Sequence, residues 1–287
     1  MGVPKIFVTG ANGQLGRDLR AIAGEYPGFD FFFFDRATMP VEDPDVLSAF
    51  FARERPAWCV NCAAYTAVDK AESEKESAFL INGDAVGYLA DECHRHGCRL
   101  IHISTDYVFD GRSDTPLQEA DVTAPINTYG ASKLEGERQA LERHPKGTVI
   151  IRTSWVYSRF GNNFVKTMLR LMKERAAVSV VSDQVGSPTY AADLAAAILH
   201  IIRYPSYTPG VYHYSSEGRI SWYEFALAIR DLTGSRCAVN PILTSQYPTP
   251  ARRPAFSLLD KTKIRIAYQL TIPDWREGLA NCLKYLV

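Results

Sequence analysis

The sequence predicts an α/β protein: a Rossmann-type, doubly wound parallel sheet joined to a smaller α/β C-terminal lobe. In the first half, short and almost continuously apolar runs alternate with amphipathic stretches. That alternation is typical of a parallel sheet covered by helices on both faces. A glycine-rich loop, Gly10-x-x-Gly13-x-x-Gly16, lies between the first apolar run and the first amphipathic stretch. A dinucleotide-binding loop is found in this setting, between a strand and a helix.

The elements of the first half follow from this alternation. Apolar runs predict strands at residues 5–9, 29–34, 58–61, 99–104 and 148–155. The amphipathic stretches between them predict helices at residues 15–23, 46–53, 76–94 and 128–143. We expect right-handed crossovers between the parallel strands. Residues 1–155 are therefore predicted to form the dinucleotide-binding domain, completed by about residues 189–205.

The second half has shorter and less regular elements. Helices are expected at residues 163–173, 191–202, 222–232 and 274–285, and strands at residues 178–181, 211–214 and 238–243. Proline and tyrosine gather in two loops, 204–209 and 247–254. We interpret residues 156–287 as a smaller substrate-binding lobe.

The composition excludes several classes of partner. The 32 basic and 32 acidic residues cancel, so no overall field attracts nucleic acid or an anionic membrane. No apolar stretch approaches the roughly 20 residues that span a bilayer. The chain enters a strand directly after its first four residues, which argues against a signal peptide. We therefore expect a cytoplasmic protein with neither a nucleic-acid nor a membrane partner.

The six cysteines predict reduced thiols rather than a metal site. Cys59 and Cys62 fall in an apolar run that reads as a buried strand and its following turn. Cys93 and Cys98 flank Gly97, where a helix should end. No second group of ligands has zinc-like spacing elsewhere in the sequence. Reduced thiols agree with a cytoplasmic location.

The glycine-rich loop predicts where a dinucleotide binds. Glycines allow the backbone to approach a pyrophosphate, whose charge sits at the helix N-terminus. Asp35, at the end of the second strand, favours the ribose hydroxyls of NAD, whereas the adjacent Arg36 can accept the 2′-phosphate of NADP. The predicted cofactor-binding residues are Gly10, Asn12, Gly13, Gln14, Leu15, Asp35, Arg36, Ala63, Ala64, Tyr65, Tyr129 and Lys133.

Tyr129 and Lys133 predict proton transfer beside that cofactor. Residues four apart on a helix lie on the same face. An ammonium beside a phenol is expected to lower a pKa that is ordinarily about 10. Thr105, at the end of the fourth strand, would face the nicotinamide and hydrogen-bond a substrate carbonyl, because ligands bind at the carboxyl ends of such strands. The three residues predict transfer of a hydride and a proton.

With these residues on one chain, the sequence resembles the dTDP-4-dehydrorhamnose reductase family of extended short-chain dehydrogenases/reductases. The matching motifs are long and specific, and include Ser104-Thr105-Asp106-Tyr107-Val108-Phe109-Asp110-Gly111 and Tyr129-Gly130-x-Ser132-Lys133-x-x-Gly136-Glu137. Further matching segments are 13–16, 64–72, 152–157, 161–164, 183–189 and 247–254. The resemblance extends over nearly the whole chain.

The resemblance implies reduction of the 4-keto group of dTDP-4-dehydro-L-rhamnose to give dTDP-L-rhamnose. NADPH is the implied cofactor, with NADH as the alternative. Thr105 would polarise the ketone, Tyr129 would deliver the proton, and Lys133 would tune the tyrosine and hold the nicotinamide ribose. The implied substrate-binding residues are Thr66, Thr105, Asp106, Trp155 and Arg253, with Trp155 against the sugar ring and Arg253 near the diphosphate.

The chain departs from the family pattern in two places. An acid expected after the second strand is replaced by Met39-Pro40-Val41, which leaves the adenosine contacts open. Some members form a magnesium-bridged dimer through acidic residues; here Asp18 is present, but Ala191-Ala192-Asp193 does not supply the expected acidic pair. We therefore expect no metal, and either a monomer or a homodimer.

Two other functions share much of this pattern. Another nucleotide-sugar reductase, epimerase or dehydratase of the same fold would use the same tyrosine and lysine. A dehydratase typically has Asp-Glu after the threonine, whereas Asp106-Tyr107 follows it here. A non-catalytic NADP-binding regulatory subunit, similar to the β subunit of methionine adenosyltransferase, would tend to lack the tryptophan at Trp155. Residues 152–155 thus favour the reductase.

Overall fold

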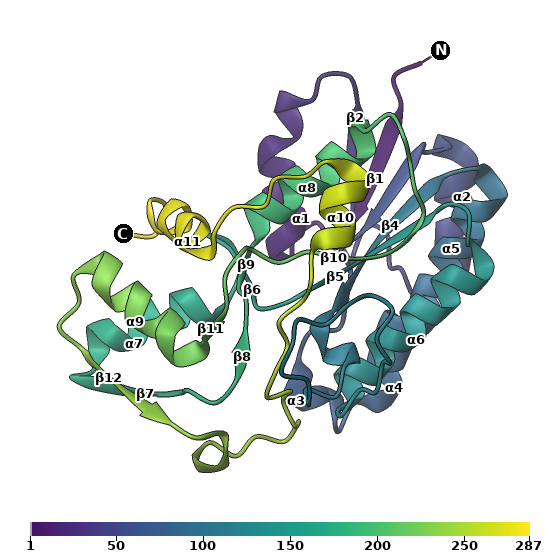
Figure 1. Ribbon diagram of the computed structural model, residues 1–287. Helices are drawn as coiled ribbons and strands as arrows, with labels where there is room; N and C mark the ends of the chain where they lie inside the picture. Colours follow the sequence, from purple (N-terminus) through teal and green to yellow (C-terminus); the bar gives the residue numbers. More distant parts are fainter. Residues whose placement is uncertain (1) are drawn as a thin grey trace.

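Six parallel strands form the central sheet of the larger lobe, in the order β10-β5-β4-β3-β1-β2. The protein is described here by a computed structural model that covers residues 2–287 (Figure 1). The strands of this sheet are β1 (Lys5–Thr9), β2 (Asp30–Phe33), β3 (Trp58–Asn61), β4 (Arg99–Thr105), β5 (Thr148–Thr153) and β10 (Gly210–His213). The predicted fold class, a Rossmann-type parallel sheet with helices on both faces, is confirmed.

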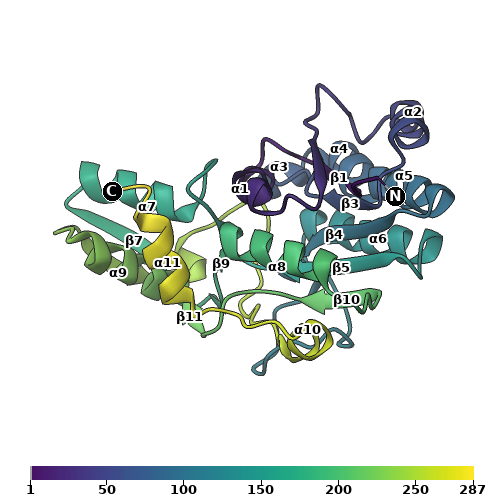
Figure 2. The same cartoon turned by 90° about the horizontal axis from the view of Figure 1, so that it is seen from above.

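Helices cover both faces of the sheet, as Figure 2 shows with the sheet seen from above. One face carries α1 (Gln14–Ile22), α8 (Ala191–Arg203) and α10 (Thr262–Tyr268). The other carries α2 (Pro44–Glu54), α5 (Ala85–His96) and α6 (Thr128–Arg143). Side chains alternate between the two cores: Ile6 and Val8 of β1 pack with the first group, whereas Phe7 between them packs with the second.

The helical stretch predicted at residues 76–94 contains a wider turn in its middle. It is formed by α4 (Lys75–Phe79), a π-helical turn (Leu80–Asp84) and α5, which follow one another without a break. A π-turn inserts one residue into the helical register and often marks a functional site. A short helix, α3 (Val68–Ala71), precedes it, and 3₁₀ turns occur at Ala23–Glu25, Asp106–Val108 and Thr244–Gln246.

The smaller lobe has its own hydrophobic core. Its helices are α7 (Phe164–Glu174), α9 (Trp222–Thr233) and α11 (Trp275–Leu283). Three short strand pairs complete it: β7 (Ala177–Val181) with β12 (Ala238–Ile242), β6 (Val156–Tyr157) with β9 (Thr189–Tyr190), and β8 (Val185–Gly186) with β11 (Ile220–Ser221). In Figure 1 this lobe lies to the left of the sheet.

The structure differs from the sequence predictions in several places. The two-residue strands β6, β8, β9 and β11 were not predicted. β5 ends at Thr153 rather than at residue 155, because Trp155 has φ +50° and cannot continue a strand. The helices α3 and α10 are short and were not predicted. β10 lies within the range assigned to the smaller lobe but pairs with β5 in the central sheet, so the two lobes are interleaved along the chain.

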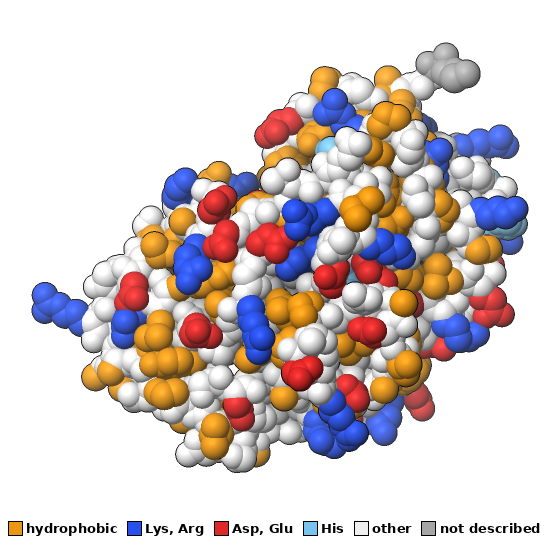
Figure 3. Space-filling view, in the orientation of Figure 1, with side chains coloured by type: hydrophobic (Ala, Val, Ile, Leu, Met, Phe, Trp, Pro, Cys, Tyr) orange, Lys and Arg blue, Asp and Glu red, His pale blue; other side chains and the backbone are white. Residues whose placement is uncertain are grey.

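The surface reflects the balanced composition. On the face shown in Figure 3, Lys and Arg side chains are interspersed with Asp and Glu side chains. Among residues 2–287, no helix is both long enough and apolar enough to cross a membrane.

Candidate active site

A cleft of about 1150 Å³ lies where the smaller lobe meets the carboxyl ends of the central strands. Every residue predicted to bind the cofactor lines this cleft. So do four of the five predicted substrate-binding residues: Thr66, Thr105, Asp106 and Trp155. The fifth, Arg253, lies outside the lining.

The glycine-rich loop is held by close backbone contacts. Gly10 has φ +64°, and a Cβ placed on it would lie 2.6 Å from the backbone of Cys62 and Ala63. A Cβ on Gly16 would lie 2.5 Å from the Gly10 carbonyl oxygen. Gly13 precedes α1, and in the described chain no side chain caps this helix start. The N–H groups of the first turn are therefore available to an anion in the cleft.

Asp35 and Arg36 are both engaged within their own loop. The Asp35 carboxylate accepts hydrogen bonds from the Asn12 amide at 2.8 Å and from the backbone of Thr38 at 3.0 Å. Hydrogen bonds from Thr38, with a smaller contribution from Asn12, hold the pKa of Asp35 below its ordinary value. The Arg36 guanidinium is largely exposed and pairs with Glu42 at 2.8 Å. An arginine that faces solvent can exchange a surface partner of this kind for a phosphate.

Thr105 and Asp106 form a polar pair at the end of β4. The Thr105 hydroxyl donates to Asp106 Oδ1 at 3.0 Å and accepts from the backbone N–H of Tyr107 at 3.2 Å. Asp106 is 2% exposed. Burial raises the pKa of Asp106 to about 7, and the nearby hydroxyls of Ser257 and Thr105 oppose the shift. This carboxyl can therefore change protonation near neutral pH.

Tyr129 and Lys133 both enter the cleft from the first turns of α6. Asn127 caps this helix by accepting from the Gly130 N–H at 2.7 Å. A Cβ on Gly130 would lie 2.1 Å from the Tyr107 carbonyl oxygen, so the glycine permits the helix to start against the β4 loop. The Tyr129 ring packs edge-on against Tyr107 with centroids 5.7 Å apart.

The prediction that Lys133 lowers the pKa of Tyr129 is wrong. Desolvation raises the pKa of Tyr129 to about 12, although the Thr105 hydroxyl acts in the opposite direction. The Lys133 ammonium is directed elsewhere: it donates to the Ile103 carbonyl at 2.6 Å and lies 3.3 Å from His102 Nε2. Burial lowers the pKa of Lys133 to about 8, against the opposing effects of Glu137 and Cys62. Helical spacing correctly placed the two residues on one face, but burial dominates their titration.

Asn82, in the π-turn, supports one wall of the cleft. Its side chain accepts from the Tyr65 N–H at 2.8 Å and donates to the Tyr65 carbonyl at 3.0 Å. It also donates to the Ser132 hydroxyl at 3.0 Å, which ties this loop to α6. Asn82 was not among the predicted site residues. The only indication of its role in the sequence is a polar side chain within a stretch that is predicted to be helical.

Trp155 is held by an aromatic stack in an unusual backbone conformation. Its ring lies parallel to that of Trp222, with centroids 3.8 Å apart and 12° between the planes. A Cβ on Gly186 would lie 3.0 Å from the Trp155 ring. A bulky residue with positive φ is rare, and such strain is concentrated at functional sites. Trp222 also lines the cleft and was not predicted.

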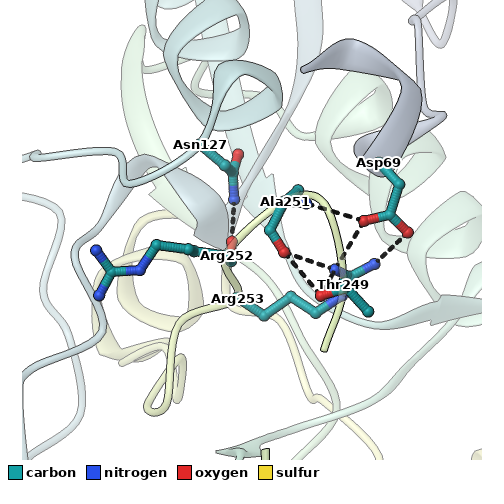
Figure 4. Close-up of polar contacts among 6 residues, drawn as sticks. All are labelled: Asp69, Asn127, Thr249, Ala251, Arg252 and Arg253. Carbon is teal, nitrogen blue, oxygen red and sulfur yellow. Dashed lines mark hydrogen bonds and ion pairs between the residues drawn. The ribbon is translucent and has the colours of Figure 1, made fainter. Parts of the chain in front are cut away.

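Arg253 is fully engaged by its neighbours instead of facing the cleft (Figure 4). Its guanidinium donates to both carboxylate oxygens of Asp69 at 2.9 Å, to the Thr249 hydroxyl at 2.6 Å and to the Ala251 carbonyl at 2.8 Å. The Arg252 side chain points away, and its carbonyl accepts from Asn127 at 2.8 Å. The predicted diphosphate contact is therefore not preformed, because the ion pair with Asp69 occupies the guanidinium.

Asp18 and Asp193 are the acidic residues that the sequence analysis considered as possible metal ligands. Asp18 is buried and accepts from the Ser158 hydroxyl at 2.5 Å. Burial raises the pKa of Asp18, and it raises that of Asp193 to about 6. Within residues 2–287, no group of three or more His, Cys, Asp or Glu side chains is arranged to hold a metal ion.

Comparison with known proteins places these features in one family. The family model described as the RmlD substrate binding domain matches residues 4–287. The dTDP-4-dehydrorhamnose reductase of Aggregatibacter actinomycetemcomitans is 41% identical, over 98% of this chain and 99% of that protein. The corresponding protein of Escherichia coli K12 is 42% identical, over 98% and 97% of the two chains.

A solved structure gives the same result. The dTDP-4-dehydrorhamnose reductase of Bacillus anthracis, determined in complex with NADP, superposes with a TM-score of 0.95. It is 39% identical, and the match covers 99% of both chains.

Proposed function

The chain belongs to the RmlD substrate-binding family, and from this premise we propose that it is an NADPH-dependent dTDP-4-dehydrorhamnose reductase. It reduces the 4-keto group of dTDP-4-dehydro-L-rhamnose to give dTDP-L-rhamnose. One observation carries the proposal: a single cleft joins the glycine-rich loop, the pair Tyr129 and Lys133, Thr105, and an aromatic wall formed by Trp155 and Trp222.

The loop fits a dinucleotide. Gly10 cannot accept a Cβ without a backbone shift, and α1 presents its first N–H groups to the cleft. Arg36 is exposed beside Asp35 and can turn from Glu42 to a 2′-phosphate, which supports NADPH over NADH. The NADP complex of the B. anthracis relative supports the same choice. When bound, this cofactor supplies the hydride.

Thr105 and Tyr129 would stabilise the charge that develops during reduction, and Tyr129 would also provide the proton. As the ketone is reduced, negative charge develops on its oxygen. The side chains of Thr105 and Tyr129 both line the cleft. The Tyr129 hydroxyl would donate to that oxygen, and the Thr105 hydroxyl would do so after turning away from Asp106 Oδ1. One such donor is worth roughly 3–4 kcal/mol in comparable sites. A Tyr129 pKa of about 12 keeps the phenol protonated at neutral pH, as a proton donor requires.

The outer part of the cleft would hold the sugar. Trp155 offers a flat apolar face suited to the C–H edges of a deoxysugar. Asp106 is buried beside Thr105, and Oδ2 of its carboxyl has no partner within the described residues. It would accept a hydrogen bond from a sugar hydroxyl, and Thr66 lies in the wall nearby. Arg253 lies behind this wall and would support it by holding Asp69 of α3 in an ion pair.

The two other functions are less well supported. An epimerase or dehydratase shares the fold, but the family match and the Thr105-Asp106-Tyr107 sequence favour the reductase. A non-catalytic regulatory subunit would not need a complete set of Thr105, Tyr129 and Lys133 beside Trp155. The six cysteines are free, which is typical of a reducing compartment and supports a cytoplasmic enzyme.

The test is oxidation of NADPH by the purified protein with dTDP-4-dehydro-L-rhamnose, followed by the loss of NADPH absorbance. We expect turnover and formation of dTDP-L-rhamnose. The Tyr129→Phe variant should lose about 10²–10⁴-fold in kcat, because it lacks the proton donor, while it still binds NADPH with little change in affinity. Absence of turnover by the folded wild-type protein would contradict the proposed function, and an active Tyr129→Phe variant would contradict the assignment of the donor.

A further inference from the structure

A row of buried polar side chains lies in the central sheet behind Lys133. Thr9 ends β1, Asn61 ends β3, and His102 lies within β4. Asn61 is 1% exposed and His102 is 0% exposed. The hydrogen bonds among them lead from the loop at Ala63, in the cofactor part of the cleft, to the Lys133 amine.

The orientation of the Asn61 amide follows from its neighbours. Asn61 Oδ1 accepts from the backbone N–H of Ala63 at 3.2 Å and from the Thr9 hydroxyl at 2.6 Å. A backbone N–H can only donate, so the oxygen of the amide must face this side. The Asn61 NH₂ group then faces His102 Nδ1, at 3.1 Å.

This arrangement fixes the tautomer of His102. The Asn61 NH₂ can only donate, so His102 Nδ1 accepts and the ring proton is on Nε2. Burial holds the pKa of His102 well below its ordinary value, and the nearby Lys133 charge adds to this effect. The ring is therefore neutral, and its Nε2–H is directed at Lys133 Nζ, 3.3 Å away.

The two protonation states of Lys133 interact differently with the Nε2–H group of His102. An ammonium has donors only and meets a second donor, whereas a neutral amine has a lone pair that accepts the hydrogen bond. Other groups face Lys133 as well: the Ile103 carbonyl, the Cys62 thiol and the Glu137 carboxylate. Glu137 is itself paired with Arg152 at 2.7 Å, which partly offsets its attraction for the ammonium.

We propose that His102 is a positioning residue for Lys133: as a neutral Nε2–H tautomer fixed by Asn61, it stabilises the amine that Lys133 becomes after giving up a proton. The inference rests on the proposed reduction. The Tyr129 O–H bond breaks and its proton joins the ketone oxygen, while the hydride from NADPH joins the carbon. The Lys133 ammonium donates one N–H to the Ile103 carbonyl. A proton from one of its other two N–H groups then restores the phenol of Tyr129, one helical turn away on the same face of α6, and the lone pair left on Nζ accepts from His102.

The tautomer can be measured without substrate or cofactor. In ¹⁵N-histidine-labelled protein, NMR should show His102 as a neutral ring protonated on Nε2 across the neutral pH range. The resonance is assigned by its loss in His102→Asn, or in His102→Gln if the first variant does not fold. A ring protonated on Nδ1, or an imidazolium, would overturn the proposal.

The effect on Lys133 is measured from the pH dependence of single-turnover NADPH oxidation. The rate should fall at high pH as the ammonium loses its proton. His102→Asn keeps an acceptor for Asn61 but removes the N–H from Lys133, so the basic limb should move up by about one pH unit. A limb that stays in place or moves down would contradict the proposal.

Asn61→Asp provides a second, independent variant. A carboxylate beside Nδ1 would draw the ring proton to that atom, so Nε2 would accept from the ammonium and the basic limb should again move up. In the His102→Asn background the same change should have little further effect, because the ring that transmits it is gone. An equal shift in both backgrounds would show that the carboxylate acts on Lys133 directly and would overturn the role of the ring.

His144→Asn is the matched control. His144 is also buried and bonded to a backbone carbonyl, that of Cys98 at 2.9 Å, but it does not face Lys133. Its variant should leave the pH profile unchanged. A folded protein without turnover, but with His102 in the expected tautomer, would contradict the proposed function alone. An active enzyme with the other tautomer would contradict this inference alone.

Discussion

The cleft has two walls that are built in different ways. The cofactor wall, formed by residues 10–16, 35–36 and 62–65, depends on backbone segments that approach within van der Waals distance, as at Gly10. The outer wall, formed by residues 66–68 with Trp155 and Trp222, depends on side chains: the tryptophan stack and, behind it, the ion pair between Arg253 and Asp69. A Cβ that clashes with backbone forces the whole loop to shift, whereas the loss of one side-chain contact leaves the other contacts in place. The walls should therefore respond differently to substitution.

The cofactor wall should be the more sensitive to a single methyl group. Gly10→Ala places a Cβ 2.6 Å from the backbone of Cys62 and Ala63, at φ +64°. Strain of about 1–3 kcal/mol and displacement of the loop should weaken NADPH binding about 100-fold. Fluorescence titration with NADPH and thermal unfolding would measure both effects.

Gly24→Ala is the control for that experiment, because a Cβ there meets no atom within 4 Å. Its NADPH affinity and melting temperature should match those of the wild type. If Gly10→Ala behaved in the same way, the close backbone contact would not determine the shape of the cofactor wall.

The outer wall should respond to loss of its ion pair by a graded change in substrate binding. Arg253→Ala removes all the guanidinium contacts with Asp69, Thr249 and Ala251. We expect KM for the sugar nucleotide to rise about tenfold, equivalent to roughly 1.4 kcal/mol, with a smaller change in kcat. Steady-state kinetics at saturating NADPH would separate the two.

Arg252→Ala is the neighbouring control, since Arg252 contributes its backbone carbonyl to Asn127 and its side chain is exposed. It should leave KM unchanged. Asp69→Asn should reproduce part of the Arg253→Ala effect. A large fall in kcat with an unchanged KM in Arg253→Ala would place the arginine in the chemical step instead.

An effect of similar size is expected at the exposed end of the cofactor wall. Arg36→Ala should reduce the preference for NADPH over NADH by about tenfold, since a solvent-exposed arginine contributes modestly. The ratio of kcat/KM for the two cofactors measures it. Glu42→Gln releases Arg36 from its ion pair and should raise the same ratio. A ratio unaffected by either variant would exclude Arg36 from the 2′-phosphate site.

The two walls also differ in how far the sequence could predict them. Periodicity and the glycine spacing predicted the sheet, the loop, and the placement of Tyr129 and Lys133 on one helix face, because these are local properties. The stack of Trp155 on Trp222 and the pairing of Arg253 with Asp69 join residues far apart in the chain, so no local pattern contains them. The predicted downward shift of the Tyr129 pKa was wrong for a related reason: the spacing of two residues in the sequence does not indicate how deeply they are buried.

The strand β10 has a consequence for how this chain can be divided. Because residues 210–213 complete the central sheet after the chain has passed through the smaller lobe, neither lobe is a continuous module. A fragment ending at residue 155 would expose the β5 edge and lose α8 and α10 from one face of the sheet. The lobes should accordingly unfold in one cooperative transition. Exchange of substrate lobes between relatives would have to respect several crossover points rather than a single fusion site.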